Sequence, residues 1–381
     1  MNPSERQRAL QLLQRIEREN LYASLLLIGE SGFVRTLVLG VLRWRSRLDH
    51  AIGVLAKRSI RQLDQQVVEV LRVGLYQLLY MDVAPYAAVS ETVDLAPKRA
   101  RGFVNAILRS ATRAKPPEPA DLPTRTAHPA WLIERWTRRY GAERTARIAE
   151  ANQELSYPDV VSLSGAAPPE SVASTLVPDV YKLHGSSAEL DRREFHPMDE
   201  GSAVVAAIAR AAGDEVLDLA AAPGGKSLYM THLGARVIAN DVSIARLTPV
   251  RGRGIPLVVS DGRRPPFARN FDVVLLDAPC SATGTIRKSP ELKWRLRENE
   301  IAQFAALQKE LLRNAKVLAK KYVVYSTCSL EPEENDAIVE GYERIDITPF
   351  VPEGARRWVE DGVLRLTPES GADGFTAFVL T

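Results

Sequence analysis

Apolar residues recur every three or four positions through roughly the first 115 residues of the chain, in ALQLLQRI, FVRTLVLGVLRW, QVVEVLRVGLYQLLYM and FVNAILRSA. This spacing places them on one face of a helix. Breakers such as Gly29, Gly32 and Pro85 fall between these segments. The pattern predicts five or more short helices packed as a bundle.

A proline-rich stretch, KPPEPADLP, ends the helical pattern with four prolines in nine residues. Prolines stiffen and extend a chain, so this stretch predicts a linker. Beyond it, HPAWLIERWTRRY and the residues up to Asn152 look helical. Residues 158–190 mix short apolar runs with Gly, Pro and Ser, which predicts a small irregular subdomain.

From about residue 196 the chain alternates between helical stretches, notably 300–319, and short Val-rich runs. These runs are EVLDL (215–219), RVIAND (236–241), PLVVS (256–260), FDVVLLD (271–277) and KYVVYST (321–327). Continuous apolar runs are typical of strands buried on both faces, and β-α alternation predicts a parallel, doubly wound sheet. We therefore predict a helical domain over 1–117, a linker over 118–127, a small subdomain over 128–195 and an α/β domain over 196–381.

The composition is that of an ordinary globular protein, with 45% apolar and 25% charged residues among 381. No apolar run approaches the roughly 18 residues that span a bilayer, and the N-terminus lacks the apolar core of a secretory signal, so we expect a cytoplasmic protein. The net charge is only +3, but 98–144 holds eleven Lys or Arg against four Asp or Glu. Such a stretch could contact RNA phosphates, although a solvent-exposed helix face can have the same charge composition.

A turn with two glycines follows the first strand of the α/β region and precedes a helix. It reads Ala220, Ala221, Ala222, Pro223, Gly224, Gly225, Lys226. Such a turn lets the backbone approach a ligand, and the start of a helix offers N–H groups to an anion. The pattern is not G-x-G-x-x-G, which disfavours a nicotinamide oxidoreductase. A carboxylate such as that of S-adenosylmethionine fits the shorter turn, while a purely structural turn is the alternative.

Two acids follow the next two strands. Asp241 ends the second strand and Asp261 follows the third, so both fall at the carboxyl edge of the sheet, where ligands bind. An acid in the first position commonly accepts from ribose hydroxyls, and one in the second can accept from an adenine amino group. Each could instead be a loop residue or a helix cap. Their placement after successive strands favours a nucleoside pocket.

The chain has only two cysteines, Cys280 and Cys328, which follow the fourth and fifth strands in DAPCSATG and YSTCSLEPEEN. If these strands are neighbours, both thiols lie at the same edge, beside the cofactor. A thiolate that adds to C6 of cytosine makes C5 nucleophilic enough to accept a methyl group. Inert buried cysteines and a redox pair are the alternatives.

The same chemistry needs two proton transfers. Addition to C6 places negative charge on N3, and Asp277, the last residue of the fourth strand, is placed to neutralise it. After methyl transfer C5 must lose a proton before the thiolate leaves. A second group near C5, for which Cys280 is the candidate, would serve or assist that step.

Three segments, LDLAAAPGGKS, LLDAPCSATGTIRKSPELKWR and YSTCSLEPEEN, resemble the Sun/Fmu-type RNA cytosine-C5 methyltransferases. The front end, with AAVSETVDLAPKRARGFVNAILR, is similar to the NusB-related domain that precedes the catalytic domain in such enzymes. The resemblance covers nearly the whole chain, although the family usually has Cys in place of Ala220. It implies a Rossmann-like α/β methyltransferase with a doubly wound, mostly parallel sheet, preceded by an all-α NusB-like bundle.

The resemblance also implies the roles of residues. Cys328 would form the covalent adduct, Cys280 would aid product release, and the loop from Ala220 to Lys226 would bind S-adenosylmethionine with Asp241, Asp261 and Asp277. The implied substrate is a cytidine in small-subunit (16S) ribosomal RNA. Transfer RNA as substrate, an exocyclic amino methyltransferase and a non-catalytic RNA-binding assembly factor are the alternatives.

Basic residues suggest where RNA would bind. Residues 287–297 hold five basic residues and one acid around Trp294, which would stack on a base or pack in the core. The helical domain offers a second basic segment. The candidate RNA-binding residues are Lys98, Arg99, Arg101, Arg109, Arg287, Lys288, Lys293 and Arg295. Five histidines without ligand spacing predict no metal site, and we expect a monomer.

Overall fold

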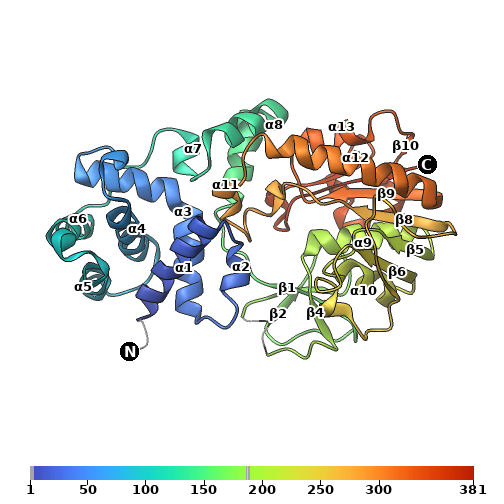
Figure 1. Cartoon of the computed structure of the whole chain (residues 1–381), viewed down its shortest axis with the longest axis horizontal. Coiled ribbons are helices and arrows are strands. Elements are labelled where there is room, and N and C mark those ends of the chain that lie inside the picture. Colours follow the sequence, from blue (N-terminus) through green and yellow to red (C-terminus); the bar gives the residue numbers. More distant parts are fainter. Residues whose placement is uncertain (1–3, 186, 188) are drawn as a thin grey trace. The chain divides into compact units, whose positions relative to one another are not determined.

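The computed structural model describes residues 4–185, 187 and 189–381 (Figure 1). It divides into two compact units, each described by itself below. The helical unit contains the chain up to Gln153 together with Ser289–Arg295, and the catalytic unit contains Glu154–Lys288 and Leu296–Thr381. The sequence analysis instead placed residues 128–153 in the second part. The structure groups them with the helical unit, where the helix Ala130–Ala151 contacts the short helix Leu122–Arg125.

The helical unit is built almost entirely of helices. They are α1 (Glu5–Glu19), α2 (Ala23–Leu26), α3 (Gly32–Ala56), α4 (Gln65–Tyr80), α5 (Pro85–Leu95), α6 (Arg101–Arg113), α7 (Leu122–Arg125), α8 (Ala130–Ala151) and α11 (Leu292–Arg295), with 3₁₀ turns at Ile60–Gln62 and Lys98–Ala100. Side chains of Ser4, Ser31 and Asp64 accept hydrogen bonds from backbone N–H groups at the starts of α1, α3 and α4. The predicted helical bundle is confirmed.

The centre of the bundle lies where α3 meets α4. A Cβ atom added at Gly40 would lie 1.8 Å from Cζ of Tyr76, so only glycine lets the two helices approach this closely. The short segment Ser289–Arg295 packs into the same unit. There the Trp294 indole donates a hydrogen bond to the carbonyl of Leu42 at 2.6 Å. Trp294 thus takes the packing role of the two roles considered for it.

The catalytic unit is organised around one nine-stranded sheet with the order β11-β12-β13-β9-β8-β5-β6-β7, with β10 paired to β13. The predicted strands are all present and run parallel: β5 (Glu215–Asp218), β6 (Arg236–Asp241), β7 (Leu257–Val259), β8 (Phe271–Asp277) and β9 (Ala319–Thr327). β8 pairs with both β5 and β9. The strand order therefore changes direction between β5 and β8, which is where a doubly wound sheet binds ligands.

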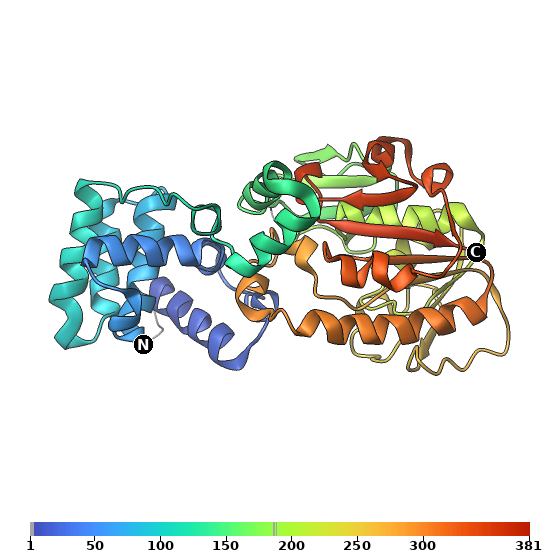
Figure 2. The same cartoon turned by 90° about the horizontal axis from the view of Figure 1, so that it is seen from above.

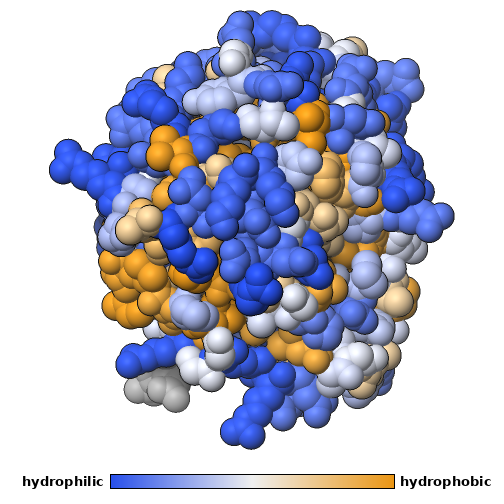
Figure 3. Space-filling view, turned by 90° about the vertical axis from the view of Figure 1, so that its right-hand side faces the viewer, coloured by the Kyte–Doolittle hydropathy of each residue, from blue (hydrophilic) through white to orange (hydrophobic). Residues whose placement is uncertain are grey.

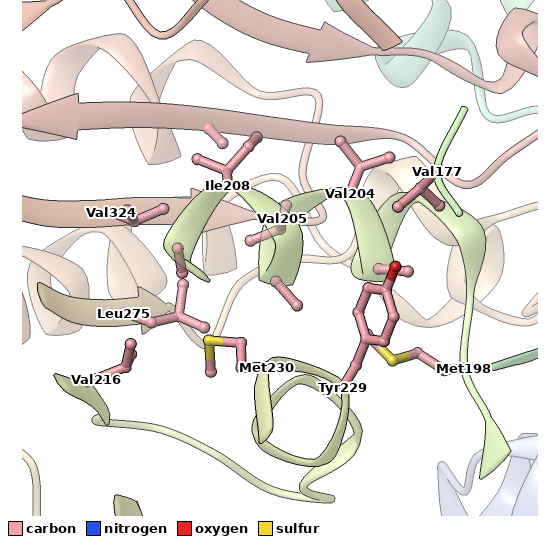
Figure 4. Packing of buried hydrophobic residues seen from close by; sticks show 14 of the residues in the cluster. Val177, Met198, Val204, Val205, Ile208, Val216, Tyr229, Met230, Leu275 and Val324 are labelled. Atoms are coloured by element: carbon pink, nitrogen blue, oxygen red, sulfur yellow. The ribbon is translucent and has the colours of Figure 1, made fainter. Parts of the chain in front are cut away.

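Helices cover both faces of this sheet (Figure 2). One face carries α9 (Glu200–Ala212) and α10 (Gly225–His232), and the other carries α12 (Glu300–Leu318) and α13 (Asp336–Val339). Figure 4 shows Val204 and Ile208 of α9 and Met230 of α10 packed with Leu275 and Val324 of the sheet. Burial of each such side chain contributes about 1.5–3 kcal/mol, so the apolar runs explain why these strands lie at the centre.

Two groups of antiparallel strands were not predicted. One is a separate four-stranded sheet, order β2-β3-β1-β4, within the region expected to be irregular: β1 (Asp159–Ser162), β2 (Ser171–Ala173), β3 (Val180–Leu183) and β4 (Phe195–Pro197). The other extends the main sheet: β10 (Arg344–Ile345), β11 (Val359–Glu360), β12 (Val363–Leu366) and β13 (Phe375–Leu380), connected through 3₁₀ turns. The sheet is therefore mostly parallel, as expected.

The surface is that of an ordinary globular protein. On the face drawn in Figure 3, hydrophilic side chains predominate and hydrophobic ones form separate patches among them. Scattered exposed apolar residues such as Val259 and Val317 are normal on protein surfaces. Within the part of the chain that the structure describes, no helix has both the length and the apolar character to cross a bilayer.

Candidate active site

The glycine turn between β5 and α10 is held against the next strand. The backbone N–H of Ala221 donates to the carbonyl of Asn240 at 2.8 Å, and that of Ala222 donates to a carboxylate oxygen of Asp241 at 3.1 Å. Gly224 closes the turn by donating to the carbonyl of Ala221 at 2.7 Å. These bonds fix the turn beside the carboxyl ends of β5 and β6.

Gly224 has a conformation and surroundings that only glycine suits. Its φ is +100°, and an added Cβ would lie 2.4 Å from a methyl of Val250. The turn is therefore packed closely against Val250. Such a turn fits a cofactor that comes into close contact with the main chain.

Replacing Gly224 with alanine should weaken S-adenosylmethionine binding by at least about tenfold, because the turn must shift away from Val250. Calorimetric titration with the cofactor measures this. Gly252→Ala is the matched control, since Gly252 also has positive φ (+78°) but open space around its Cβ position. Equal affinities of the Gly224→Ala and Gly252→Ala proteins would contradict the assignment of this turn to the cofactor.

Other polar groups around the turn suit the same cofactor. The first N–H groups of α10 have no acceptor within the helix and favour a carboxylate. Asp241 is buried and also accepts from the N–H of Ser243 at 3.0 Å, which holds its carboxylate at the strand end. Asp218, which ends β5, is fully buried with one carboxylate oxygen without a partner, and burial raises its pKa to about 7. Asp218 was missed by the sequence analysis.

Asp261 lies further out than expected for a pocket residue. Its carboxylate forms a bidentate ion pair with Arg263, with a closest distance of 2.7 Å, and this bond lowers the pKa of Asp261. The side chain is about two-fifths exposed. Its role toward an adenine amino group stays a prediction.

Asp277 lies at the end of β8 between two partners. The Lys226 ammonium contacts one carboxylate oxygen at 2.5 Å, and the Ser326 hydroxyl donates to the other at 2.8 Å. Burial opposes the charge on Lys226, but the neighbouring Asp277 carboxylate raises the pKa of Lys226 above its usual value. Lys226, expected only as part of the cofactor loop, therefore stays charged and forms an ion pair with the acid of the site.

The two cysteines meet beside this pair. Their sulfur atoms lie 3.3 Å apart, and both thiols are free and partly exposed. The hydrogen bond to Cys328 and burial together raise the pKa of Cys280 well above its usual value. Cys280 therefore stays protonated at neutral pH, and either sulfur can be the donor of the hydrogen bond between the two.

A buried carboxylate that the sequence analysis missed connects the two cysteine loops. Glu334 accepts from the N–H of Ser281 at 2.8 Å, from the Ser281 hydroxyl and from the Ser329 hydroxyl at 2.5 Å. Gln308 of α12 donates to Glu334 at 3.2 Å and to the carbonyl of Pro279 at 2.8 Å. Since Ser281 follows Cys280 and Ser329 follows Cys328, Glu334 fixes the two thiols relative to one another. We regard it as a positioning residue.

Three of the expected RNA contacts are corrected by the structure. Lys293 is 2% exposed, and its ammonium donates to the carbonyl of Arg43 at 2.8 Å within the helical unit. Lys288 forms ion pairs with Asp159, at 2.7 Å, and Asp199. Arg287, also buried, donates to the carbonyl of Gly371 at 2.6 Å. All three side chains are held by partners within the fold, so we do not assign them to RNA contacts.

The remaining candidates lie in the helical unit. Lys98, Arg99 and Arg109 are exposed. Arg101 donates to the backbone carbonyls of Ala96 and Asp94, and Arg295 lies over the Tyr22 ring, 4.0 Å from its centroid. RNA contacts by these five residues stay predictions.

A mostly parallel sheet with this strand order and a glycine turn at its switch point defines an S-adenosylmethionine-dependent methyltransferase. Residues 205–376 match the family described as 16S rRNA methyltransferase RsmB/F, and residues 3–113 match the NusB family. The chain belongs to the RsmB/F family, and it is an S-adenosylmethionine-dependent RNA (cytosine-C5)-methyltransferase.

Relatives and solved structures agree with this membership. The chain is 33% identical over 356 residues to ribosomal RNA small subunit methyltransferase B of Shigella flexneri serotype 5b, covering 82% of each chain. It is 33% identical over 346 residues to the protein of that name from Sodalis glossinidius, covering 80% of this chain and 79% of the relative. The crystal structure of PH0851 has a TM-score of 0.72 at 24% identity, covering 100% and 99%. NSun6 from Pyrococcus horikoshii with SFG has a TM-score of 0.56 at 19% identity, covering 66% and 97%, and shares the fold.

Proposed function

We propose that this enzyme methylates C5 of a cytidine in small-subunit (16S) ribosomal RNA through a covalent bond between Cys328 and C6 of the base. The pair of thiols 3.3 Å apart, at the sheet edge that carries Asp277 and the glycine turn, is the observation that carries the proposal. A pair of sulfurs beside an acid suits addition to a pyrimidine and its later reversal.

Each residue of the site has its own role in the first steps of the reaction. The Cys328 thiolate forms the S–C6 bond, and the electrons released from the C5–C6 bond move toward N3. The carboxylate of Asp277 takes a proton from the Lys226 ammonium, 2.5 Å away, and passes it to N3. Bound S-adenosylmethionine supplies the electrophilic methyl group to C5.

Release of the product needs the reverse movement of electrons. C5 loses its proton, the electron pair re-forms the C5–C6 double bond, and the S–C6 bond breaks to return the Cys328 thiolate. Cys280 is the sulfur nearest to that bond, and its raised pKa keeps it a thiol in the resting enzyme. We assign it to the release step: its thiol stabilises the departing Cys328 thiolate by a hydrogen bond, while the C5 proton passes to solvent.

Replacing Cys280 with alanine should therefore let the adduct form but resolve slowly. After incubation with S-adenosylmethionine and 16S ribosomal RNA, a large share of the protein should run as a shifted, ribonuclease-sensitive band on a denaturing gel. Bisulfite sequencing of the trapped RNA identifies the base, and transfer RNA in place of ribosomal RNA tests the substrate class.

Two controls make this result specific. Cys280→Ala combined with Cys328→Ala should give no shifted band, because the adduct needs the Cys328 sulfur. A Cys280→Ala protein that turns over like the wild type without any shifted band would refute the release role. Trapping on transfer RNA alone would refute the proposed substrate.

A further inference from the structure

The helical unit has a surface groove between α5 and α6 whose lining has been given no role so far, apart from Arg109 as a candidate RNA contact. It encloses about 480 Å³ and is lined by Tyr86, Ser90 and Asp94 of α5 and by Asn105, Arg109 and Arg113 of α6. Its walls thus combine an aromatic ring, two guanidinium groups and several hydrogen-bonding side chains. The groove lies entirely within one unit.

Tyr86 is the most exposed large apolar side chain of the described residues, at 81%. It follows Pro85, the first residue of α5, which fixes the backbone at the start of the helix. Exposure of an aromatic ring to water is energetically unfavourable, and the ring offers a flat surface for stacking. Because polar side chains surround this ring, a planar group with polar edges would fit the groove.

The charges of the groove favour an anion. Arg109 and Arg113 lie one helical turn apart on α6, about 6 Å at their Cβ atoms. Arg109 uses its Nε to donate to Asn105 at 3.2 Å, and Arg113 makes no ion pair with an acid in the described part of the chain. Asp94, the acid of the groove, is paired with Arg101 at 3.4 Å.

We infer that this groove holds an unpaired segment of the substrate RNA, with a base stacked on Tyr86 and adjoining phosphates on Arg109 and Arg113. Single strands present both the exposed base and the flexible backbone that this combination recognises, whereas bases inside a duplex are not free to stack. The inference rests on the proposed function, because it takes RNA as the substrate.

Binding of a fluorescein-labelled, single-stranded RNA of about twelve nucleotides, followed by anisotropy, tests this directly. Tyr86→Ala should weaken binding by about tenfold, and Tyr86→Phe, which keeps the ring, should restore most of it. Arg109→Ala combined with Arg113→Ala should lower the slope of log affinity against log salt by about 0.7 per arginine. Binding of a blunt duplex of the same sequence should change much less in the Tyr86 variants.

Arg18→Ala is the matched control, because Arg18 is an exposed arginine on α1 with 73% of its side chain accessible. If Tyr86→Ala binds single strands like the wild type, or if Tyr86→Phe loses as much as Tyr86→Ala, the stacking site is overturned. The same holds for the phosphate site if the arginine variants match Arg18→Ala.

The experiment separates this inference from the proposed function. Anisotropy needs no methyl transfer, so it reports on the groove even if the covalent mechanism fails. In turnover with 16S ribosomal RNA, Tyr86→Ala should raise KM much more than it lowers kcat. A fall in kcat alone would overturn the docking role while leaving Cys328 chemistry intact.

Discussion

Replacing Cys328 with alanine should abolish methyl transfer, lowering kcat by on the order of 10⁴-fold or more, as removal of an enzyme nucleophile does. Without the sulfur no bond forms to C6, so C5 stays a poor nucleophile however well the RNA and cofactor bind. Transfer of tritium from labelled S-adenosylmethionine to RNA measures the loss. Calorimetry should show unchanged cofactor affinity, because the glycine turn keeps its own hydrogen bonds to Asn240 and Asp241.

The comparison with Cys280→Ala makes this prediction sharper. Both variants remove one sulfur from the same pair at 3.3 Å, so both disturb packing to a similar extent. Only Cys280→Ala should yield RNA-linked protein. Retained turnover in Cys328→Ala would instead favour methylation of an exocyclic amino group, which needs no thiol.

Replacing Asp277 with asparagine should lower kcat by roughly 10²–10⁴-fold, the range typical for a lost proton donor. Asparagine has nearly the same shape but cannot take up a proton and pass it on, and it removes the ion pair with Lys226. The charge that develops at N3 is then left unneutralised, so adduct formation itself should slow. Single-turnover assays on the Cys280→Ala background would follow that step alone.

Asp272→Asn provides the control, since Asp272 lies at the other end of the same strand and pairs with Lys321 at 3.6 Å. It should leave the rate of adduct formation within a factor of about two, because surface substitutions of this kind have small effects. An Asp277→Asn enzyme that formed the adduct at the wild-type rate would remove Asp277 from the mechanism.

The five parallel strands were predictable because each contains a continuous apolar run; β5, β6, β8 and β9 are largely buried, whereas β7 at the sheet edge is partly exposed. The antiparallel strands lack that signal. Two of the three residues of β2 are exposed, and β10 and β11 have only two residues each. Their hydrogen bonds come from partners that the local sequence does not specify, as β13 is held by β9 about fifty residues earlier in the chain.

The residues of the candidate active site also divide into those that the sequence could predict and those that it could not. Cys280, Cys328 and Asp277 could be predicted because each follows the end of a strand, and strand ends meet at one edge. Glu334 could not, because its partner Ser281 lies 53 residues away and nothing nearby marks it as buried. Lys293 was wrongly predicted to contact RNA, because lysines are almost always exposed whereas Lys293 is buried.

The segment Ser289–Arg295 has a consequence for how the protein can be divided. It belongs to the helical unit although it is encoded within the catalytic half, so the polypeptide passes between the two units three times. A chain cut after residue 153 would lack the piece that places Trp294 against Leu42. The fragment that begins after residue 153 would contain Trp294 without the helical bundle that covers it. The two halves are therefore poor candidates for independent modules, and exchanging either one with that of a relative should succeed only if this short segment is exchanged with the bundle that encloses it.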